Sequence, residues 1–367
     1  MRGFWSNLFT VAIVLVIAGV IGLKSLDSTF GNPGPLAEDT TFVVPSGAGL
    51  GRITDALLEE GVIDSGWMFT LAARRAGVAQ SMKAGEYLIP AGASIEDVMA
   101  LISEGRAVQH RVTVAEGLTS RQVVEIVRAS EVLTGEIANV PPEGALAPDT
   151  YFVQRGETRQ AVIDRMLVSQ ERSLAEAWAA RAPDLPYDTP VEALILASIV
   201  EKETGVGGAR PEVAGVFVNR LRRGMRLQSD PTIIYGISGG EPLGDGEGNR
   251  RGIRRSEIRK ETPYNTYTID GLPPTPIANP GVSAIEAVMN PAATEYLFFV
   301  ASCDFDGSHG FSKTLREHEA KVREWRRCEN LRPADGGLPH PLELLRQWLL
   351  ARSYIEFDPT VARERGL

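Results

Sequence analysis

Apolar and polar positions between residues 40 and 166 repeat one short pattern: a β-rich run, a polar turn with glycine, then an amphipathic helix. The pattern occurs in TFVVPSGAGLGRITDALL, YLIPAGASIEDVMALI, VTVAEGLTSRQVVEIV and YFVQRGETRQAVIDRM. In the second stretch Ser94 precedes Asp97 by three residues, and in the third Thr119 precedes Gln122, spacings typical of helix N-terminal caps. The units have no fixed period, so they predict an α+β architecture and not a solenoid.

A second helix, SGWMFTLAARRAG, lies between the first two units, so residues 41–89 read strand, helix, helix, strand. This order resembles a LysM module, a small domain that binds N-acetylglucosamine polymers. We therefore assign residues 40–110 to a LysM-like βααβ module and 111–150 to an αβ connecting region. A purely structural role for the module is the alternative, because the likeness rests on element order and not on a sharp motif.

The N-terminus carries a long apolar segment, with no charged residue from Gly3 to Leu23. Its length is close to the roughly 20 apolar residues that cross a bilayer. No A-x-A cleavage site follows, so we expect an uncleaved transmembrane helix at 4–24, after a tail at 1–3 and before a linker at 25–39. The charge of Arg2 favours a cytoplasmic tail, with the body of the chain exported.

Composition narrows the functional class. The 367 residues are 43% hydrophobic and 23% charged, which is typical of a globular chain of two or three domains. The net charge of -9 argues against binding to nucleic acid. Four histidines without metal-ligand spacing, and no C-x-x-C, P-loop or G-x-S-x-G motif, predict neither a metal nor another cofactor. Cys303 and Cys328 could form one disulfide or remain two buried thiols.

The stretch LILASIVEKETG, residues 194–205, predicts a helix that is apolar on nearly every side and therefore buried. At its end Glu201 follows a face of mostly small residues, while Glu203 is rotated from it by about 200° and should point elsewhere. Burial and the negative helix end would raise the pKa of Glu201, so that it could donate a proton near neutral pH. The alternative is a solvated helix end formed by Glu201, Lys202 and Glu203.

Two later stretches, RLQSDPTIIYG and TPYNTYTIDGLPPTPIANPG, concentrate amides, hydroxyls and aromatic rings. Such side chains suit sugars, whose hydroxyls need polar partners and whose ring faces need aromatic ones. The candidate substrate-binding residues are Gln228, Asp230, Tyr235, Tyr264, Asn265 and Tyr267. Each tyrosine could instead be a core or strand residue. His309 is expected in a turn before a helix. It could line the same substrate-binding cleft as these residues, or it could cap that helix.

These stretches, together with ASIVEKETG, VAGVFVNRLRRGM and GSHGFSKTLREH, resemble the successive motifs of the endolytic murein transglycosylases of the MltG type. The resemblance covers the anchor, the LysM-like module and a mixed α/β catalytic domain that we place at 151–330. The predicted helical extension at 331–367 has no counterpart in the family core.

The resemblance implies that Glu201 is the sole catalytic acid and base. The implied reaction is that of a lyase, which cuts the N-acetylmuramic acid–β-1,4–N-acetylglucosamine bond inside nascent peptidoglycan strands and closes a 1,6-anhydro ring. It also implies a single-pass inner-membrane protein that faces the periplasm, beside cell-wall synthases, and ends glycan polymerisation. Two alternatives stay open: an inert glycan-binding scaffold, and a hydrolytic muramidase in which Asp230 activates water.

Overall fold

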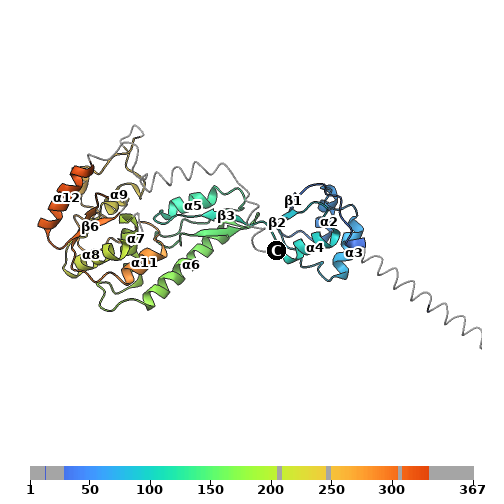
Figure 1. Cartoon of the computed structure of the whole chain (residues 1–367), viewed down its shortest axis with the longest axis horizontal. Coiled ribbons are helices and arrows are strands. Elements are labelled where there is room, and N and C mark those ends of the chain that lie inside the picture. The colour runs from blue at the N-terminus through green and yellow to red at the C-terminus, as the bar shows by residue number, and fades with distance from the viewer. Residues whose placement is uncertain (1–12, 14–28, 205–208, 245–248, 305–307, 330–367) are drawn as a thin grey trace, which may run out of the picture. The chain divides into compact units, whose positions relative to one another are not determined.

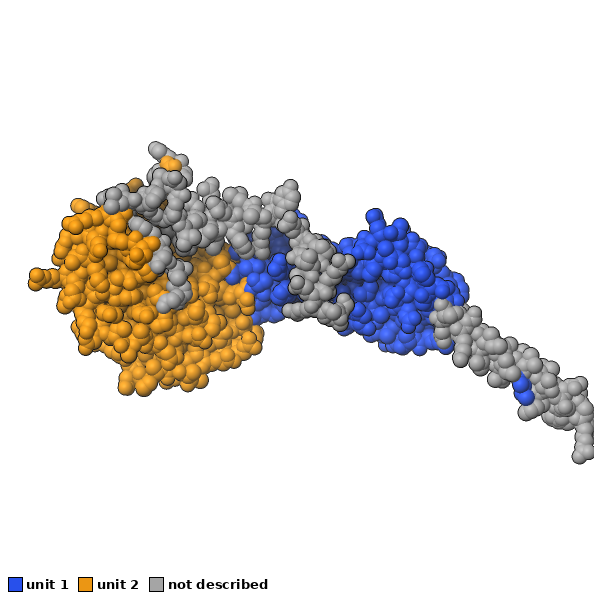
Figure 2. All heavy atoms as spheres, in the orientation of Figure 1, with its two compact units in different colours: residues 1–114, 124–139, 150–165 blue, residues 115–123, 140–149, 166–367 orange. Residues whose placement is uncertain are grey.

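The structure is a computed structural model that describes residues 13, 29–204, 209–244, 249–304 and 308–329. The chain forms two compact units, coloured separately in Figure 2. Unit 1 contains residues 1–114, 124–139 and 150–165, and unit 2 contains residues 115–123, 140–149 and 166–367. The predicted connecting region is thus divided between the two units. Helices and two-stranded antiparallel sheets make up the mixed α/β fold (Figure 1).

Unit 1 begins with the predicted order of strand, helix, helix and strand, which is confirmed. The elements are β1 (Thr40–Val44), α2 (Leu50–Glu59), α3 (Gly66–Arg75) and β2 (Gly85–Ile89). β1 and β2 pair antiparallel, with Thr40 opposite Ile89. Their inward side chains Phe42 and Tyr87 are fully buried in one core with the helices. Phe30, inside the predicted linker, also belongs to this core. The likeness to LysM itself stays a prediction.

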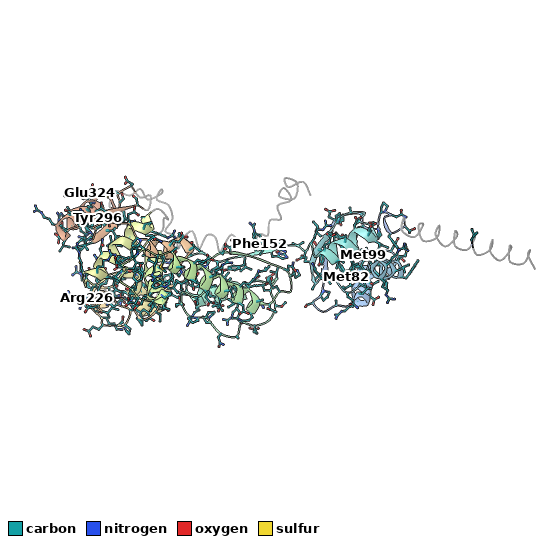
Figure 3. The ribbon with its side chains drawn as sticks, turned by 90° about the horizontal axis from the view of Figure 1, so that it is seen from below. Met82, Met99, Phe152, Arg226, Tyr296 and Glu324 are labelled. Atoms are coloured by element: carbon teal, nitrogen blue, oxygen red, sulfur yellow. A yellow bond between two sulfur atoms is a disulfide. The ribbon has the colours of Figure 1, made fainter. Side chains whose placement is uncertain are left out.

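The next helix, α4 (Ile95–Glu104), completes this core. It begins with the predicted capping box, in which Ser94 and Asp97 each bind the other's backbone N–H. It ends at Gly105, whose φ of 76° is readily adopted by glycine. Met82 and Met99 are partly buried against the same core (Figure 3).

A second antiparallel pair joins β3 (His110–Thr113) to β4 (Thr150–Val153), with His110 opposite Val153. The helix α5 (Ser120–Arg128) follows β3. Its predicted capping box is also confirmed: Thr119 N donates to Gln122 Oε1 at 3.0 Å, and Gln122 N donates to Thr119 Oγ1 at 3.3 Å. The sequence therefore marked this helix start correctly.

In the described part of unit 2, helices outnumber strands. Its elements are the C-terminal part of α6 (Arg159–Ala179), then α7 (Pro190–Glu203), α8 (Arg210–Arg222), α9 (Asp230–Ser238), α10 (Arg255–Ile258), α11 (Val282–Met289), β5 (Phe298–Ala301), β6 (His309–Ser312) and α12 (Leu315–Glu329). The central helix is α7, which packs against α8, α9 and α11. Every residue from Ala193 to Glu201 is buried, as the apolar pattern predicted. Thr189 and Glu192 cap its start.

The C-terminal part of unit 2 is a β5–β6 hairpin followed by α12. Residues 309–312 pair antiparallel with 298–301, so the expectation that His309 lies in a turn is wrong. A β-rich partner strand, FFVA, overrides the local turn residues around His309. Cys303 and Cys328 form a disulfide that joins the end of the hairpin's first strand to α12. Of the two alternatives for these cysteines, the structure shows the bridged one.

Within the described residues, no helix is both long enough and apolar enough to span a membrane. The predicted tail, the transmembrane helix at 4–24 except for Ile13, and the extension at 331–367 lie outside these residues. These three assignments stay predictions.

Candidate active site

Glu201, the predicted acid, is 8% exposed and has both carboxylate oxygens occupied. Oε1 accepts a hydrogen bond from Arg210 Nη2 at 2.7 Å, and Oε2 accepts one from Gly281 N at 3.0 Å. Arg210 is the first residue of α8, and it also donates to Glu116 Oε2 at 2.8 Å and to Ser283 Oγ at 2.9 Å. Glu201 and Arg210 thus form a buried ion pair within a network that joins α7, α8, α11 and two loops, and its outer members Glu116 and Ser283 are exposed.

The face of small residues beside Glu201 is covered. Ser198 Oγ accepts a hydrogen bond from Ile277 N at 3.0 Å, so the loop before α11 lies over the small residues of α7. The solvated alternative is not observed either, because Lys202 is partly buried and donates to Gly117 O at 3.1 Å. Burial raises the pKa of Glu201, and the adjacent Arg210 opposes that rise by favouring the carboxylate.

Glu203, the last residue of α7, is partly buried and has a different set of partners. Ser229 Oγ donates to its Oε1 at 2.6 Å. Burial raises the pKa of Glu203 to about 7, with a further rise from the Asp230 carboxylate and opposition from Ser229 and Arg220. The prediction that the two acids diverge is confirmed. The acid that faces the predicted sugar-binding residues, however, is Glu203.

The two polar stretches meet beside Glu203. Gln228 N donates to Thr266 O at 3.1 Å, and Ser229 N donates to Thr266 Oγ1 at 2.9 Å. At the start of α9, Asp230 Oδ1 accepts a hydrogen bond from Tyr267 OH at 2.7 Å. Gln228 and Asp230 are both exposed. Their side chains are therefore accessible to a ligand next to a partly buried carboxyl group.

Tyr235 and Tyr264 form an aromatic pair further along α9. Their ring centroids are 5.0 Å apart in an edge-to-face arrangement, and Tyr264 OH is 2.8 Å from Thr275 Oγ1. Both rings are partly buried, and burial raises the pKa of Tyr235 to about 12. Each residue combines a hydroxyl group with an apolar ring, which suits contact with a sugar.

Asn265 is buried, and its amide organises the loop. Its Nδ2 donates to the carbonyl oxygens of Glu257, Ile258 and Lys260, and its Oδ1 accepts from Tyr267 N at 3.0 Å. All the polar atoms of the side chain therefore bind the chain itself. We expect Asn265 to act on a ligand through the position of Tyr267 and not by direct contact.

His309 lies at the start of β6 and packs edge-on against Phe299, with ring centroids 5.5 Å apart. Burial lowers its pKa, which favours the neutral imidazole. In the part of the chain that the structure describes, its ring contacts are with Phe299 and Phe311, which belong to the unit 2 core. The structure does not bring it into contact with the residues around Glu203. Its assignment to the cleft stays a prediction.

Sequence reasoning missed three residues next to the predicted sugar-binding residues: Glu203, Ser229 and Arg220. Helical spacing correctly separated Glu201 from Glu203, but it contains no information about which face meets the Gln228–Asp230 turn. The available signal was the position of Glu203 at the last residue of the helix, where a side chain can emerge from the core. No cluster of three or more His, Cys, Asp or Glu side chains in the described ranges could hold a metal ion.

Comparison with known proteins places the chain in a family. A sequence model described as the YceG-like family matches residues 42–324. The endolytic murein transglycosylase of Bacillus subtilis (strain 168) is 28% identical over 325 residues, which cover 79% of this chain and 86% of that protein. The endolytic murein transglycosylase of Streptococcus pneumoniae serotype 2 (strain D39) is 27% identical over 368 residues, 88% of this chain and 65% of that protein.

A crystal structure of a YceG-like protein from Listeria monocytogenes is also similar, with 26% identity and a TM-score of 0.45. The match covers 77% of this chain and 99% of that one. The family match itself runs from β1 to α12, includes Glu201 and Glu203, and spans well over half of the sequence. The chain therefore belongs to the YceG-like family.

Proposed function

We propose that this chain is an endolytic lytic transglycosylase of peptidoglycan, and that Glu203 is its catalytic acid and base. The proposal rests chiefly on one observation: the Glu203 carboxyl group binds Ser229 Oγ at 2.6 Å, between Gln228 and Asp230 of a stretch predicted to bind sugars, and burial there raises its pKa to about 7. The relatives named endolytic murein transglycosylases support the same reaction and substrate class. A general acid works best when its pKa is near the operating pH.

Glu203 is a better candidate than Glu201 on geometric grounds. Both oxygens of Glu201 already bind groups of the chain, and its pairing with Arg210 opposes the rise in pKa that burial causes. Glu203 has one serine partner and no direct ion pair among the described residues. Because burial raises its pKa to about 7, about half of the molecules hold the proton near neutral pH.

The reaction needs only one carboxyl group. Glu203 donates its proton to the glycosidic oxygen, and the bond between that oxygen and C1 of the N-acetylmuramic acid breaks. The C6 hydroxyl of the same sugar then attacks C1, and the Glu203 carboxylate takes the hydroxyl proton. The products are a free N-acetylglucosamine end and a 1,6-anhydro ring, and the acid is restored. No water is consumed.

The exposed residues beside Glu203 supply contacts for the strand. We assign Gln228 and Asp230 to sugar hydroxyls or acetamido groups, and Tyr267 to the sugar next to the broken bond. Tyr235 and Tyr264 lie further along α9 and would support a more distant sugar. Contacts on several sugars suit cleavage within a strand, which would limit strand length beside cell-wall synthases. The predicted anchor would hold the enzyme at the inner membrane, facing the periplasm.

The decisive experiment digests nascent, uncrosslinked glycan strands with the wild type, Glu203→Gln and Glu201→Gln, and identifies the new ends by mass spectrometry. We expect anhydro ends from the wild type, a loss of at least about 10³-fold in Glu203→Gln, and retained cleavage in folded Glu201→Gln. Glu201→Gln is the matched control, because it removes a carboxylate two residues away on the same helix.

The other readings give different results. If Glu201→Gln abolishes cleavage in a folded protein while Glu203→Gln does not, the acid is Glu201, as the sequence suggested. Reducing N-acetylmuramic acid ends would identify a hydrolase, in which Asp230 could activate water. No cleavage by a folded wild type would favour a glycan-binding scaffold.

A further inference from the structure

Arg220, on α8, is a buried cation whose guanidinium binds backbone carbonyl groups and no carboxylate among the described residues. Its Nε donates to Leu297 O at 2.7 Å, and its Nη1 donates to Leu227 O at 2.7 Å and Arg226 O at 3.2 Å. The cation also lies over the ring of Phe298, 5.2 Å from its centroid. A buried charge is costly unless its surroundings compensate it, so this arrangement requires an explanation.

The turn that Arg220 holds has an unusual backbone. Gln228 has a φ of 53°, a left-handed conformation that non-glycine residues rarely adopt. The next residue is Ser229, whose hydroxyl reaches Glu203. Strained residues of this kind persist only where the surroundings over-determine them. Here Arg220 binds the two carbonyl groups before Gln228, and Thr266 binds the backbone N–H groups of Gln228 and Ser229.

The charge of Arg220 also acts on the site. It favours the ionised form of Glu203 and opposes the rise in the pKa of that group. The other titratable groups that interact with Arg220 or Glu203 are Asp230 at the start of α9, Tyr267 on the facing loop, and His318 on α12. Burial lowers the pKa of His318, and the nearby Arg220 lowers it further. Arg220 is thus the cation that acts on Glu203 in this set.

We propose that Arg220 is a positioning residue of the active site: it holds the Arg226–Gln228 turn so that Ser229 reaches Glu203, and its charge stabilises the Glu203 carboxylate formed after proton donation. The inference rests on the proposed role of Glu203. In the first half of the reaction Arg220 fixes the acid in place. In the second half it stabilises the base that must deprotonate the C6 hydroxyl.

Three variants of the full chain in mild detergent test the proposal. Arg220→Met removes the charge and the hydrogen bonds but keeps an apolar side chain of similar length. Arg220→Lys keeps the charge but lacks the planar guanidinium group and its paired N–H donors. Arg222→Met is the matched control, because Arg222 lies on the same helix, is exposed, and binds Asp184 O. The readouts are kcat/KM between pH 5 and 9, and urea unfolding over the same range in backgrounds with and without Glu203→Gln.

We expect Arg220→Met to lose about 10²-fold in kcat/KM, since a misplaced catalytic group has an effect of that size. The fall of its kcat/KM at alkaline pH should shift to higher pH by about one unit, because an acid without its nearby cation keeps its proton to higher pH. Arg220→Lys should have a lower kcat/KM but the same pH dependence as the wild type. Arg222→Met should match the wild type in kcat/KM and in its pH dependence. The proposal would be overturned if kcat/KM of folded Arg220→Met falls at the same pH as that of the wild type, or if Arg222→Met shows the same shift as Arg220→Met.

The unfolding measurement separates this inference from the catalytic role of Glu203. The stability difference between proteins with and without Glu203→Gln varies with pH around the pKa of Glu203, whether or not Glu203 takes part in the reaction. If Glu203→Gln stays active, the proposed acid is wrong, yet a shift of this pH range in Arg220→Met would still show the effect of the Arg220 charge on Glu203. If Arg220→Met does not fold, the result for Arg220→Lys tests the proposal. A loss of activity in Arg220→Lys, with an unchanged pH range for the effect of Glu203 on stability, supports the proposal, and wild-type activity refutes it.

Discussion

Replacing Arg210 by methionine tests whether Glu201 belongs to a structural ion network. Arg210 is buried, and it is the cation that contacts Glu201 Oε1. Methionine keeps most of the apolar stem but removes the charge and the donors. Glu201 would then be a buried carboxylate whose remaining described partner is Gly281 N. The variant should therefore be less stable, by an amount that depends on pH.

The size of the effect has an upper bound. A buried carboxyl without its cation can escape the electrostatic cost by taking up a proton. At pH 7 the free energy needed to protonate Glu201 is at most about 3.4 kcal/mol, which corresponds to the 2.5 pH units between pH 7 and the ordinary pKa of 4.5. The bound agrees with the roughly 3–5 kcal/mol measured when one partner of a buried ion pair is removed. Near pH 4.5 the electrostatic part should approach zero.

Burial already raises the pKa of Glu201 in the folded wild type, and losing Arg210 raises it further, so the folded variant keeps its proton to higher pH. Above the ordinary pKa of 4.5 the stability of the variant should therefore come to fall more than that of the wild type, and the gap should widen toward pH 7. Urea unfolding at several pH values, followed by circular dichroism, measures this gap. Arg210→Lys, which keeps a positive charge, should show a smaller pH dependence.

A second variant provides the internal control. Adding Glu201→Gln to Arg210→Met removes the titrating group, so the pH-dependent part of the loss should disappear. The reasoning is refuted if Arg210→Met loses the same stability at pH 5 and pH 7. It is also refuted if the double variant keeps the full pH dependence, because another group would then be responsible.

Other expectations concern the site and its support. The kcat/KM of the wild type should fall about tenfold per pH unit above pH 7, because Glu203 of the free enzyme must be protonated. Ser229→Ala removes a hydrogen bond that favours the carboxylate, so its kcat/KM should begin to fall at higher pH. Asn265→Ala removes the amide that binds three partly buried backbone carbonyl groups and should lower stability by about 1–3 kcal/mol in urea unfolding. Cys303→Ser opens a loop of 25 residues and should cost about 3 kcal/mol, measured against the wild type with and without reductant; equal stabilities would contradict that bridge.

Much of the local structure could be predicted because it depends on neighbours in sequence. The caps at Ser94 and Thr119 need a partner only three residues away, and both formed as expected. The strand order of the first module follows from alternating apolar positions and glycine turns. His309 shows the limit of this reasoning: its local residues suggest a turn, but pairing with residues 298–301 makes it part of a strand.

The sequence alone determined that α7 is a buried helix whose two terminal acids point in different directions, because helical periodicity fixes both properties. It also brought the candidate sugar-binding stretches to attention through their composition. Only the tertiary structure decided which acid faces them. Arg210, from α8, pairs with Glu201, whereas Ser229, from the turn before α9, binds Glu203. These partners come from elements that are separate from α7 in the sequence, and no local pattern encodes that choice.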